Sequence, residues 1–434
     1  MPTAVCLQLH YLTSLKKHPT VVMHDGGGNQ ESSVISLYGN IFITFVGAGI
    51  LGLPYAFKEA GIIEGAVVLA FVALLSIKAM FLVIDCKYKI LSQQLDLEKL
   101  LEGDGKQDVD LEYGDVGQVA LGNTGRWLVE VSLCLSQVGF CCAYAIFIPH
   151  NVVLSIPAFN YSGLLLLLLP GWIMLNLLRT LKSLAIFSLM ADFATLFAYV
   201  VVFWFDFEHF DNIEKGLREE SLVNLPFFLG ISMYCFEGAG MILALETSVS
   251  QNLRKNFKKI FAKALSLLVL LYITFGICGY MSFGHTTEQI ITLNLPDGII
   301  PNIVRLCLSF SLFFTYPVMM FPVVKLLDKK FRSSDNLHKS NLMRVCLVLT
   351  TYVVIAVVPN FSLLMAFVGA TCCTLLGFIL PALFHLKIFK DSLTQREKIW
   401  DIAILVIGVI GGVISTIDAL QRMFVGDPVE NPAS

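Results

Sequence analysis

The sequence Phe45-Val-Gly-Ala-Gly-Ile-Leu-Gly-Leu-Pro-Tyr55 lies inside a long apolar segment and is rich in helix breakers. An interior glycine costs a helix roughly 1 kcal/mol and an interior proline about 3 kcal/mol. A continuous helix through Gly47, Gly49, Gly52 and Pro54 is therefore unfavourable, and we predict a transmembrane helix that breaks here. In lipid, such a break is tolerated only where the freed amides and carbonyls face protein or a water-filled cavity. In transporters these cavities commonly bind substrate.

The composition around this segment is that of a membrane protein. Of 434 residues, 56% are hydrophobic and 15% are charged, with a mean hydropathy of +0.74, whereas an ordinary soluble domain has about 25% charged residues. We therefore predict an all-α, multi-pass integral membrane protein whose surroundings are the lipid bilayer. Residues 1–36 lack the pattern of a signal peptide, so we expect the first span to act as its own insertion signal.

About 20 apolar residues are needed to cross a bilayer as a helix, and this criterion predicts eleven spans. The predicted layout is a cytosolic tail at 1–36, a transporter domain at 37–421 and a non-cytosolic tail at 422–434. The spans cover approximately residues 37–57, 62–85, 127–149, 162–178, 184–205, 225–247, 258–281, 300–326, 342–358, 361–386 and 399–421.

The distribution of Lys and Arg predicts the orientation. With the N-terminus in the cytosol, 23 of the 30 basic residues fall in cytosolic segments and 4 on the opposite side, as the positive-inside rule requires. The C-terminus should therefore face away from the cytosol. Asn160 and Asn360 match the glycosylation acceptor pattern in non-cytosolic loops, but these short loops hold them close to the membrane, so we do not expect their use.

A second break is predicted in the sixth span, where Glu237-Gly-Ala-Gly240 interrupts the apolar sequence at its centre. The first break is in the first span, so the two are offset by five helices. Because five is odd, the second half would be inverted relative to the first, with repeats at about 37–205 and 225–386 and an extra helix at about 399–421. Paired interrupted segments are the best sequence pointer to the binding site of an inverted-repeat transporter.

The first break has the chemistry of a site for a zwitterion. Pro54 suits the first turn of a new helix, so the residues before it should offer free N–H groups at a positive helix end, which binds anions. Residues nearer Thr44 and Gly47 should present carbonyls to an ammonium group. The segment expected to bind the substrate carboxylate comprises Gly49, Ile50, Leu51 and Gly52, with Ala48 also in the site.

Several motifs, in order along all eleven spans, resemble the amino acid/auxin permease family. Within it, the chain looks most like the plant vacuolar amino-acid transporters and is similar to the animal proton-coupled ones. The motifs are Gly39-Asn40, Gly47-Ala-Gly-Ile-Leu-Gly-Leu-Pro-Tyr55, Tyr113-Gly-Asp115, Ser136-Gln-Val-Gly-Phe-Cys-Cys142, Phe236-Glu-Gly238, Phe313-Phe-Thr-Tyr-Pro317 and Gly377-Phe-Ile-Leu-Pro-Ala-Leu-Phe-His385.

The resemblance implies the five-plus-five inverted-repeat fold of the bacterial leucine transporter and movement of amino acids with protons. Similar plant members export neutral amino acids from the vacuole to the cytosol. This chain departs from the animal members at Asn40, where they have a histidine. Because asparagine does not titrate in the physiological range, a histidine-based proton step is not available there.

Glu237 and Asp192 are the proton-coupling candidates. A carboxyl at mid-membrane is costly when charged and unpaired, so Glu237 could carry a proton or pair with the substrate ammonium. Alternatively, it could hold the unwound backbone through hydrogen bonds. The fold implied by the resemblance brings the fifth span close to the first near a coupling-ion site. Asp192 is therefore the other candidate, unless it is a hydrogen-bonded carboxyl or a residue at the helix rim.

Further side chains are expected to line the site. Gln137 and Tyr144 are seven residues apart on the third span and share a helix face, so they could orient a substrate or bind a neighbouring helix. Tyr234 and Phe236 flank the second break and would form part of the apolar wall that sizes the substrate side chain, which Phe314 and Thr315 of the eighth span could join. Gly238 is also expected in the site.

The sequence contains no phosphate-binding loop, nucleophile elbow or metal-ligand cluster. We therefore expect no enzymatic activity, no cofactor, no metal and no nucleic-acid partner. The predicted function is secondary transport of neutral amino acids, with protons, from a vacuole-like or lysosome-like compartment to the cytosol. The alternatives are import at the plasma membrane and an amino-acid sensor that signals through a cytosolic partner. The identity of the amino acid and the oligomeric state remain open.

Overall fold

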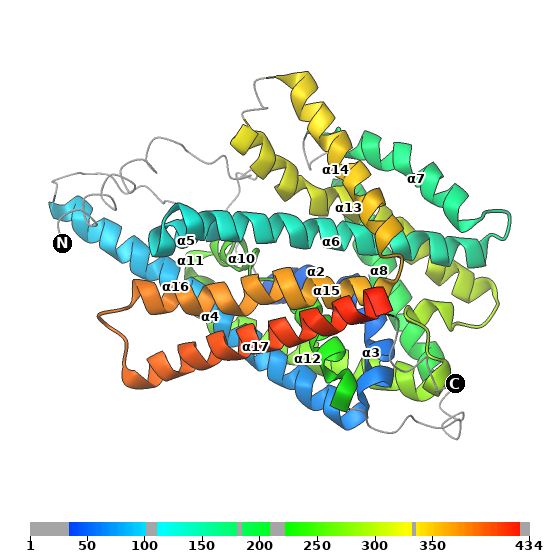
Figure 1. Ribbon diagram of the computed structural model, residues 1–434, viewed down its shortest axis with the longest axis horizontal. Helices are drawn as coiled ribbons and strands as arrows, with labels where there is room; N and C mark the ends of the chain where they lie inside the picture. Colours follow the sequence, from blue (N-terminus) through cyan, green and yellow to red (C-terminus); the bar gives the residue numbers. More distant parts are fainter. Residues whose placement is uncertain (1–33, 101–110, 180–184, 209–221, 332–335, 426–434) are drawn as a thin grey trace.

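The computed structural model describes residues 34–100, 111–179, 185–208, 222–331 and 336–425, and every regular element in these ranges is helical (Figure 1). The elements of the first half are α2 (Val34–Phe45), η1 (Ala48–Gly52), α3 (Leu53–Ala60), α4 (Ile62–Leu100), α5 (Tyr113–Leu121), α6 (Asn123–Ser155), α7 (Tyr161–Asn176) and α8 (Ala185–Glu208).

The second half continues the helical bundle. Its elements are η4 (Leu222–Asn224), α9 (Leu225–Cys235), α10 (Ile242–Thr247), α11 (Gln251–Arg254), α12 (Phe257–Phe283), η5 (Gly284–Thr286), η6 (Ile291–Leu293), α13 (Ile299–Phe331), α14 (Leu337–Val357), α15 (Phe361–Val368), η8 (Gly369–Cys373), η9 (Leu375–Ile379), α16 (Leu380–Ile388) and α17 (Gln395–Val425).

Within the described residues, seven helices are long and apolar enough to cross a membrane. The pair formed by α2 and the segment Ala48–Ala60 adds an eighth and is bent by 52°. Apolar helices α7 and α9 are shorter. Each predicted span coincides with helical structure, but the count of eleven membrane crossings stays a prediction.

Helices α4 and α17 extend beyond the predicted spans because the 20-residue criterion measures only the apolar part of a helix. The second span was expected to end at residue 85, but α4 continues to Leu100, and α5 forms where a loop was expected. The C-terminal tail was expected to begin at residue 422, but α17 extends to Val425. The polar run at 101–110 lies outside the described residues.

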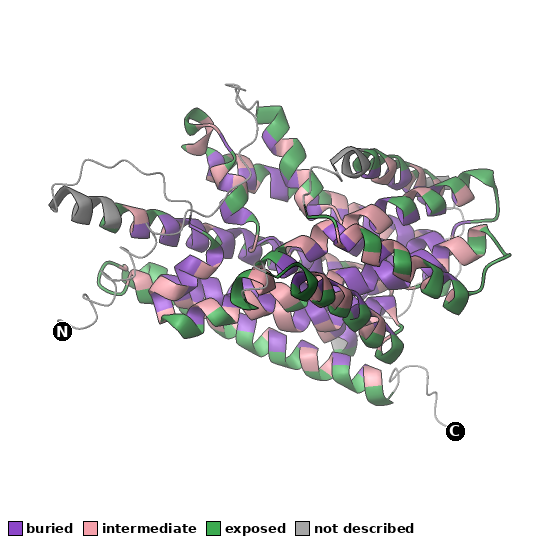
Figure 2. Ribbon diagram, turned by 90° about the horizontal axis from the view of Figure 1, so that it is seen from above, coloured by how far each residue is buried: buried purple, intermediate pink, exposed green. Residues whose placement is uncertain are grey.

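Buried residues lie at the centre of the bundle and exposed residues on its outer faces (Figure 2). The exposed residues include large apolar ones. Leu74, Trp204 and Val357 are between 66% and 71% exposed. In water such exposure would be unfavourable, whereas a bilayer solvates these side chains. The outer faces of the helices are therefore suited to lipid.

The centre of the bundle depends on a close approach between α9 and η8. A Cβ atom on Gly369 would lie 1.9 Å from the carbonyl oxygen of Gly230, so only glycine fits. Small residues at such contacts let membrane helices pack backbone to backbone. This contact fixes α9, which leads into the second break, against the tenth predicted span.

Candidate functional site

The first break forms where it was predicted. Helix α2 ends at Phe45, a short 3₁₀ helix spans Ala48–Gly52, and α3 begins at Leu53 with Pro54 in its first turn. Pro54 has no N–H to lose there. Gly47, just before η1, has an extended backbone, which separates the end of α2 from the new helix.

Two tyrosine hydroxyls bind the carbonyls that the break frees. Tyr272 on α12 donates to the Phe45 carbonyl at 2.6 Å, and Tyr199 on α8 donates to the Gly47 carbonyl at 2.9 Å. Buried carbonyls require such partners. The hydroxyl of Thr44 instead donates to the Asn40 carbonyl, four residues earlier on its own helix, at 2.7 Å.

The hydrogen bonding of the amides in the first break differs from the prediction. The Ile50 N–H donates to the Gly47 carbonyl at 3.3 Å, and the Leu53 N–H donates to the Ile50 carbonyl. These are the bonds of a 3₁₀ helix, which pairs each amide with the carbonyl three residues earlier. Ile50, Leu51 and Gly52 therefore do not supply the free donors. The amides that precede the first bond are those of Ala48 and Gly49, at the start of η1.

The second break also forms as predicted, between Cys235 at the end of α9 and Ile242 at the start of α10. Glu237 lies within it and is half-buried. Its Oε2 accepts a hydrogen bond from the Ala239 N–H at 3.3 Å. The carboxyl thus turns back onto the unwound backbone.

The two breaks contact each other. A Cβ atom on Gly238 would lie 2.2 Å from the Phe45 ring. A Cβ atom on Gly49 would lie 3.1 Å from Cys235 Sγ and 3.3 Å from the Tyr234 ring. A Cβ atom on Gly47 would meet nothing within 4 Å, so there is open space on that side of the break. Segments almost two hundred residues apart therefore form one region in the centre of the protein.

Aromatic side chains form the surroundings of this region. Tyr234 contacts Phe140 of α6 edge to face, with 4.8 Å between ring centroids, and Phe236 packs on Tyr272 at 5.5 Å. Tyr144 of α6 is buried and lies four residues after Phe140, on the same face of that helix. Tyr144, Tyr234 and Phe236 are thus brought together near the breaks.

Three other predicted residues are placed differently. Gln137 is half-buried on α6. Phe314 on α13 contacts Phe310 and Phe313 of its own helix, with centroid distances of 4.9 and 5.2 Å. Asp192 is exposed on α8, seven residues before Tyr199. Asp192 thus lies on an exposed part of α8, and the ring contacts of Phe314 with Phe310 and Phe313 are within α13.

Sequence reasoning missed Tyr199 and Tyr272, which hold the first break. Each is a hydroxyl-bearing residue in an otherwise apolar span, and this is a weak signal because phenols are common in membrane proteins. Their bonding partners are 152 and 227 residues away in the sequence.

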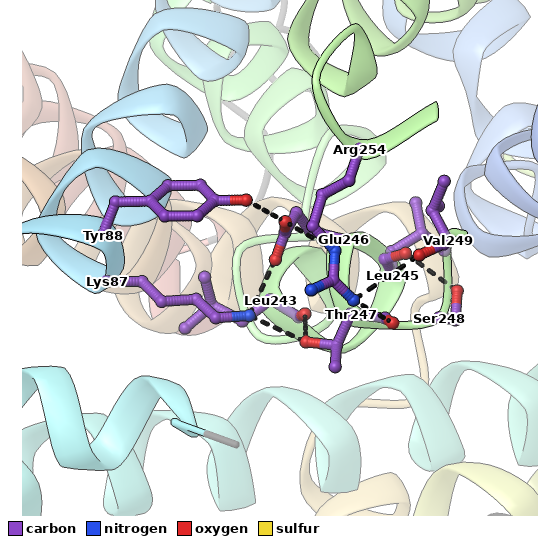
Figure 3. A network of polar contacts seen from close by, with 9 residues as sticks. All are labelled: Lys87, Tyr88, Leu243, Leu245, Glu246, Thr247, Ser248, Val249 and Arg254. Carbon is purple, nitrogen blue, oxygen red and sulfur yellow. Dashed lines mark hydrogen bonds and ion pairs between the residues drawn. The ribbon is translucent and has the colours of Figure 1, made fainter. Parts of the chain in front are cut away.

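A buried ionic network holds α10 to α4 at the end of the bundle that was predicted to be cytosolic (Figure 3). Lys87 Nζ lies 2.7 Å from Glu246 Oε2 and donates to Thr247 Oγ1 at 2.8 Å. The Tyr88 hydroxyl donates to Glu246, and Arg254 Nε lies 3.4 Å from the same carboxylate. Lys87 and Glu246 are 4% and 1% exposed, so their charges compensate each other away from water.

A second network joins α17 to both broken helices at the opposite end. Arg422 Nη2 donates to Asn224 Oδ1 at 2.7 Å, and Arg422 Nη1 lies 3.7 Å from Glu59 Oε2 at the end of α3. The guanidinium group also lies over the Phe227 ring at 4.5 Å. Because Asn224 directly precedes α9, this single arginine contacts the starts or ends of two half-helices that flank the breaks.

Replacing Arg422 with lysine is expected to lower the free energy of unfolding by about 1–3 kcal/mol. Lysine keeps the charge but cannot contact Asn224, Glu59 and Phe227 together. A buried polar group that loses its hydrogen-bond partner costs about this much free energy. Thermal unfolding of the purified protein in detergent measures the change. Arg396→Lys, at an exposed position on the same helix, is the control, and an equal effect of both variants would contradict the network's role.

Comparison with known proteins agrees with this architecture. The family model described as transmembrane amino acid transporter protein matches residues 30–421. The chain is 35% identical over 415 residues to amino acid transporter AVT3B of Arabidopsis thaliana, covering 92% of this chain and 96% of that protein. It is 32% identical over 416 residues to amino acid transporter ANT1 of the same organism, covering 91% and 93%.

The fold also matches that of a solved transporter structure. MhsT in complex with L-phenylalanine aligns over 91% of this chain and all of its own, with a TM-score of 0.52 at 11% identity. This likeness shows the fold alone. The predicted leucine-transporter-like fold, with broken helices, is thereby confirmed.

Proposed function

Since the chain belongs to the transmembrane amino acid transporter family, we propose that it exports neutral amino acids, together with protons, from an acidic vacuole-like compartment to the cytosol. It is a membrane transporter and not an enzyme. The observation that carries the proposal is the contact between the two breaks, at Phe45 with Gly238 and at Gly49 with Tyr234.

The proposed site suits both charged ends of an amino acid. The amides of Ala48 and Gly49, at the start of η1, would bind the carboxylate, since a helix start combines N–H donors with a positive dipole end. Carbonyls of the unwound segments would bind the ammonium group. Open space beside Gly47 would admit the substrate backbone.

The wall of the site supports a neutral side chain. Phe45, Tyr234 and Phe236 are buried aromatic residues next to the breaks. The Glu237 carboxyl, the ionisable group within the second break, accepts a hydrogen bond from the loop itself. A charged substrate side chain would lose its hydration against these aromatic rings, which offer no opposite charge.

The direction of transport follows from the gradient. A proton that moves with the substrate would drive it from an acidic lumen to the neutral cytosol. Opening would alternate as the halves of the broken helices move relative to the surrounding bundle. The motif resemblance to plant vacuolar transporters supports the compartment, and the distribution of Lys and Arg supports a cytosolic N-terminus.

The direct test uses purified protein in liposomes that are neutral inside and acidic outside. We expect accumulation of alanine, leucine or phenylalanine, no accumulation of lysine or glutamate, and loss of accumulation when a protonophore removes the gradient. Protein-free liposomes are the control. Absence of uptake for every neutral amino acid would contradict transport, and uptake that ignores the gradient would contradict proton coupling.

Replacing Glu237 with glutamine is expected to leave gradient-driven uptake within about threefold of the wild-type rate, a change worth under 1 kcal/mol. The glutamine amide oxygen can still accept the Ala239 N–H bond that the structure shows. Initial uptake rates under a pH gradient measure this. Loss of gradient-driven uptake with retained substrate exchange would instead make Glu237 the proton carrier.

A further inference from the structure

Asp206, near the end of α8, is a buried acid whose carboxyl group has no hydrogen-bond partner among the residues that the structure describes. Its side chain is 0% exposed, and within those residues neither carboxyl oxygen accepts a hydrogen bond. The Ser282 hydroxyl of α12 donates to the main-chain carbonyl of Asp206 and, at 2.8 Å, to that of Cys278, but not to the carboxyl group. All other acids discussed above are paired, hydrogen-bonded or exposed.

In the part of the chain that the structure describes, the helices packed against α8 do not supply a positive charge to this carboxyl. Helix α8 packs against α12 and α13. On α12, the titratable group that interacts electrostatically with Asp206 is the Cys278 thiol, which carries no positive charge. On α13, the charged side chain toward this end is Arg305, whose guanidinium donates to the carbonyls of Thr292 and Leu295 and to Asn302 Oδ1. A carboxylate without cation or donor is strongly disfavoured inside a protein, so the neutral, protonated acid is the stable form here.

The position of Asp206 links it to the first break. Tyr199, which donates to the Gly47 carbonyl, is seven residues earlier on the same helix, or about 10 Å along its axis. Tyr272 on α12 donates to the Phe45 carbonyl, and Ser282 joins α12 to α8 at the level of Asp206. Helices α8 and α12 therefore bind the first break through Tyr199 and Tyr272, and further along their axes they pack around Asp206.

We propose that Asp206 is the proton-binding group of the transport cycle, a role that rests on the proton-coupled transport proposed above. The acid takes up a proton from the acidic side, and the neutral carboxyl lets α8 and α12 pack as observed, with both tyrosines on the break. When the proton leaves to the neutral side, the carboxylate requires water or a cation, so the end of α8 must separate from α12. The tyrosine contacts change with it, which couples proton release to the opening of the site.

The test compares exchange with accumulation in liposomes. Asp206→Asn keeps the shape of the neutral acid but carries no proton. We expect exchange of labelled alanine for unlabelled alanine, at equal pH on both sides, to stay within about twofold of wild type. For one proton per substrate, a gradient of two pH units supports accumulation of about 100-fold, and the variant should fall to about onefold. Alanine-induced proton movement, followed with a dye inside the liposomes, should disappear.

The exposed acid on the same helix provides the matched control. Asp192→Asn should accumulate alanine and move protons as the wild type does. The proposal would be overturned if Asp206→Asn accumulated alanine with normal proton movement, or if it lost exchange and accumulation equally while remaining folded. If the wild-type chain transported no amino acid, the proposed function itself would fail. If it transported without protons, Asp206 would have no such role.

A measurement on the wild-type chain covers the case in which the asparagine variant does not fold. Dicyclohexylcarbodiimide is apolar and modifies protonated carboxyls. Peptide mass spectrometry is expected to find Asp206 modified, more slowly as the pH rises, together with loss of accumulation. Full accumulation after modification of Asp206, or no modification of it at any pH, would contradict the assignment.

Discussion

Gly49→Leu should abolish amino acid uptake while the protein still folds. Even a Cβ atom at this position would lie 3.1 Å from Cys235 Sγ and 3.3 Å from the Tyr234 ring. A leucine side chain would fill the space between the two breaks and cover the amide that we assign to the substrate carboxylate. Overpacking costs about 1–3 kcal/mol, and each 1.4 kcal/mol of lost substrate binding is about a tenfold loss.

Initial uptake rates, normalised to the amount of reconstituted protein, measure this effect, and size-exclusion chromatography checks the fold. Gly39→Leu is the matched control, because Gly39 is exposed on α2 and has nothing within 4 Å of its Cβ position. It should transport as the wild type does. An uptake rate for Gly49→Leu equal to that of Gly39→Leu would show that the substrate does not bind between the breaks.

Lys87→Met is expected to destabilise the protein by about 3–5 kcal/mol, the cost of breaking a buried ion pair by removing one partner. Glu246 would remain 1% exposed and lose the cation at 2.7 Å, with only Arg254 at 3.4 Å on its other oxygen. Helix α10, the short half of the second break, would lose its ion pair with α4 and, of its contacts with α4 in this network, keep only the hydrogen bond from Tyr88 to Glu246 (Figure 3).

Chemical unfolding in mixed micelles measures this loss. The double variant Lys87→Met with Glu246→Gln should recover part of the stability, because it leaves no unpaired buried charge. Lys78→Met changes an exposed lysine on the same helix and should have little effect. Equal stability of Lys87→Met and Lys78→Met would mean that the pair contributes nothing to the folded protein.

The predictable part of the structure follows from local chain chemistry. Helices are interrupted by glycine and proline at residues 47–54 and by glycine at 238 and 240, and this effect does not depend on tertiary contacts. Both breaks form where they were predicted. The two breaks were paired because they are five helices apart, as expected of an inverted repeat. In the structure they contact each other. The helical spans followed from bilayer thickness, although the 20-residue rule could not find the ends of α4 and α17.

The parts that could not be predicted depend on tertiary contacts. The hydroxyls of Tyr199 and Tyr272 bind carbonyls on a distant helix, and nothing in their local sequence distinguishes them from lipid-facing tyrosines. The 3₁₀ pairing of Ile50 depends on a small shift in backbone angles that composition does not reveal. Asp206 was overlooked because the predicted fifth span ended at residue 205, which made it a loop residue, whereas α8 continues to Glu208 and buries it.

Equilibrium binding of a labelled neutral amino acid to the purified protein, without any gradient, tests most directly whether the paired breaks form the substrate site. We predict saturable binding by the wild type and by Gly39→Leu, and none by Gly49→Leu. The Asp206→Asn variant should bind as the wild type does, since its defect is in proton coupling. Undiminished binding by Gly49→Leu would contradict the assignment of the site to the two breaks.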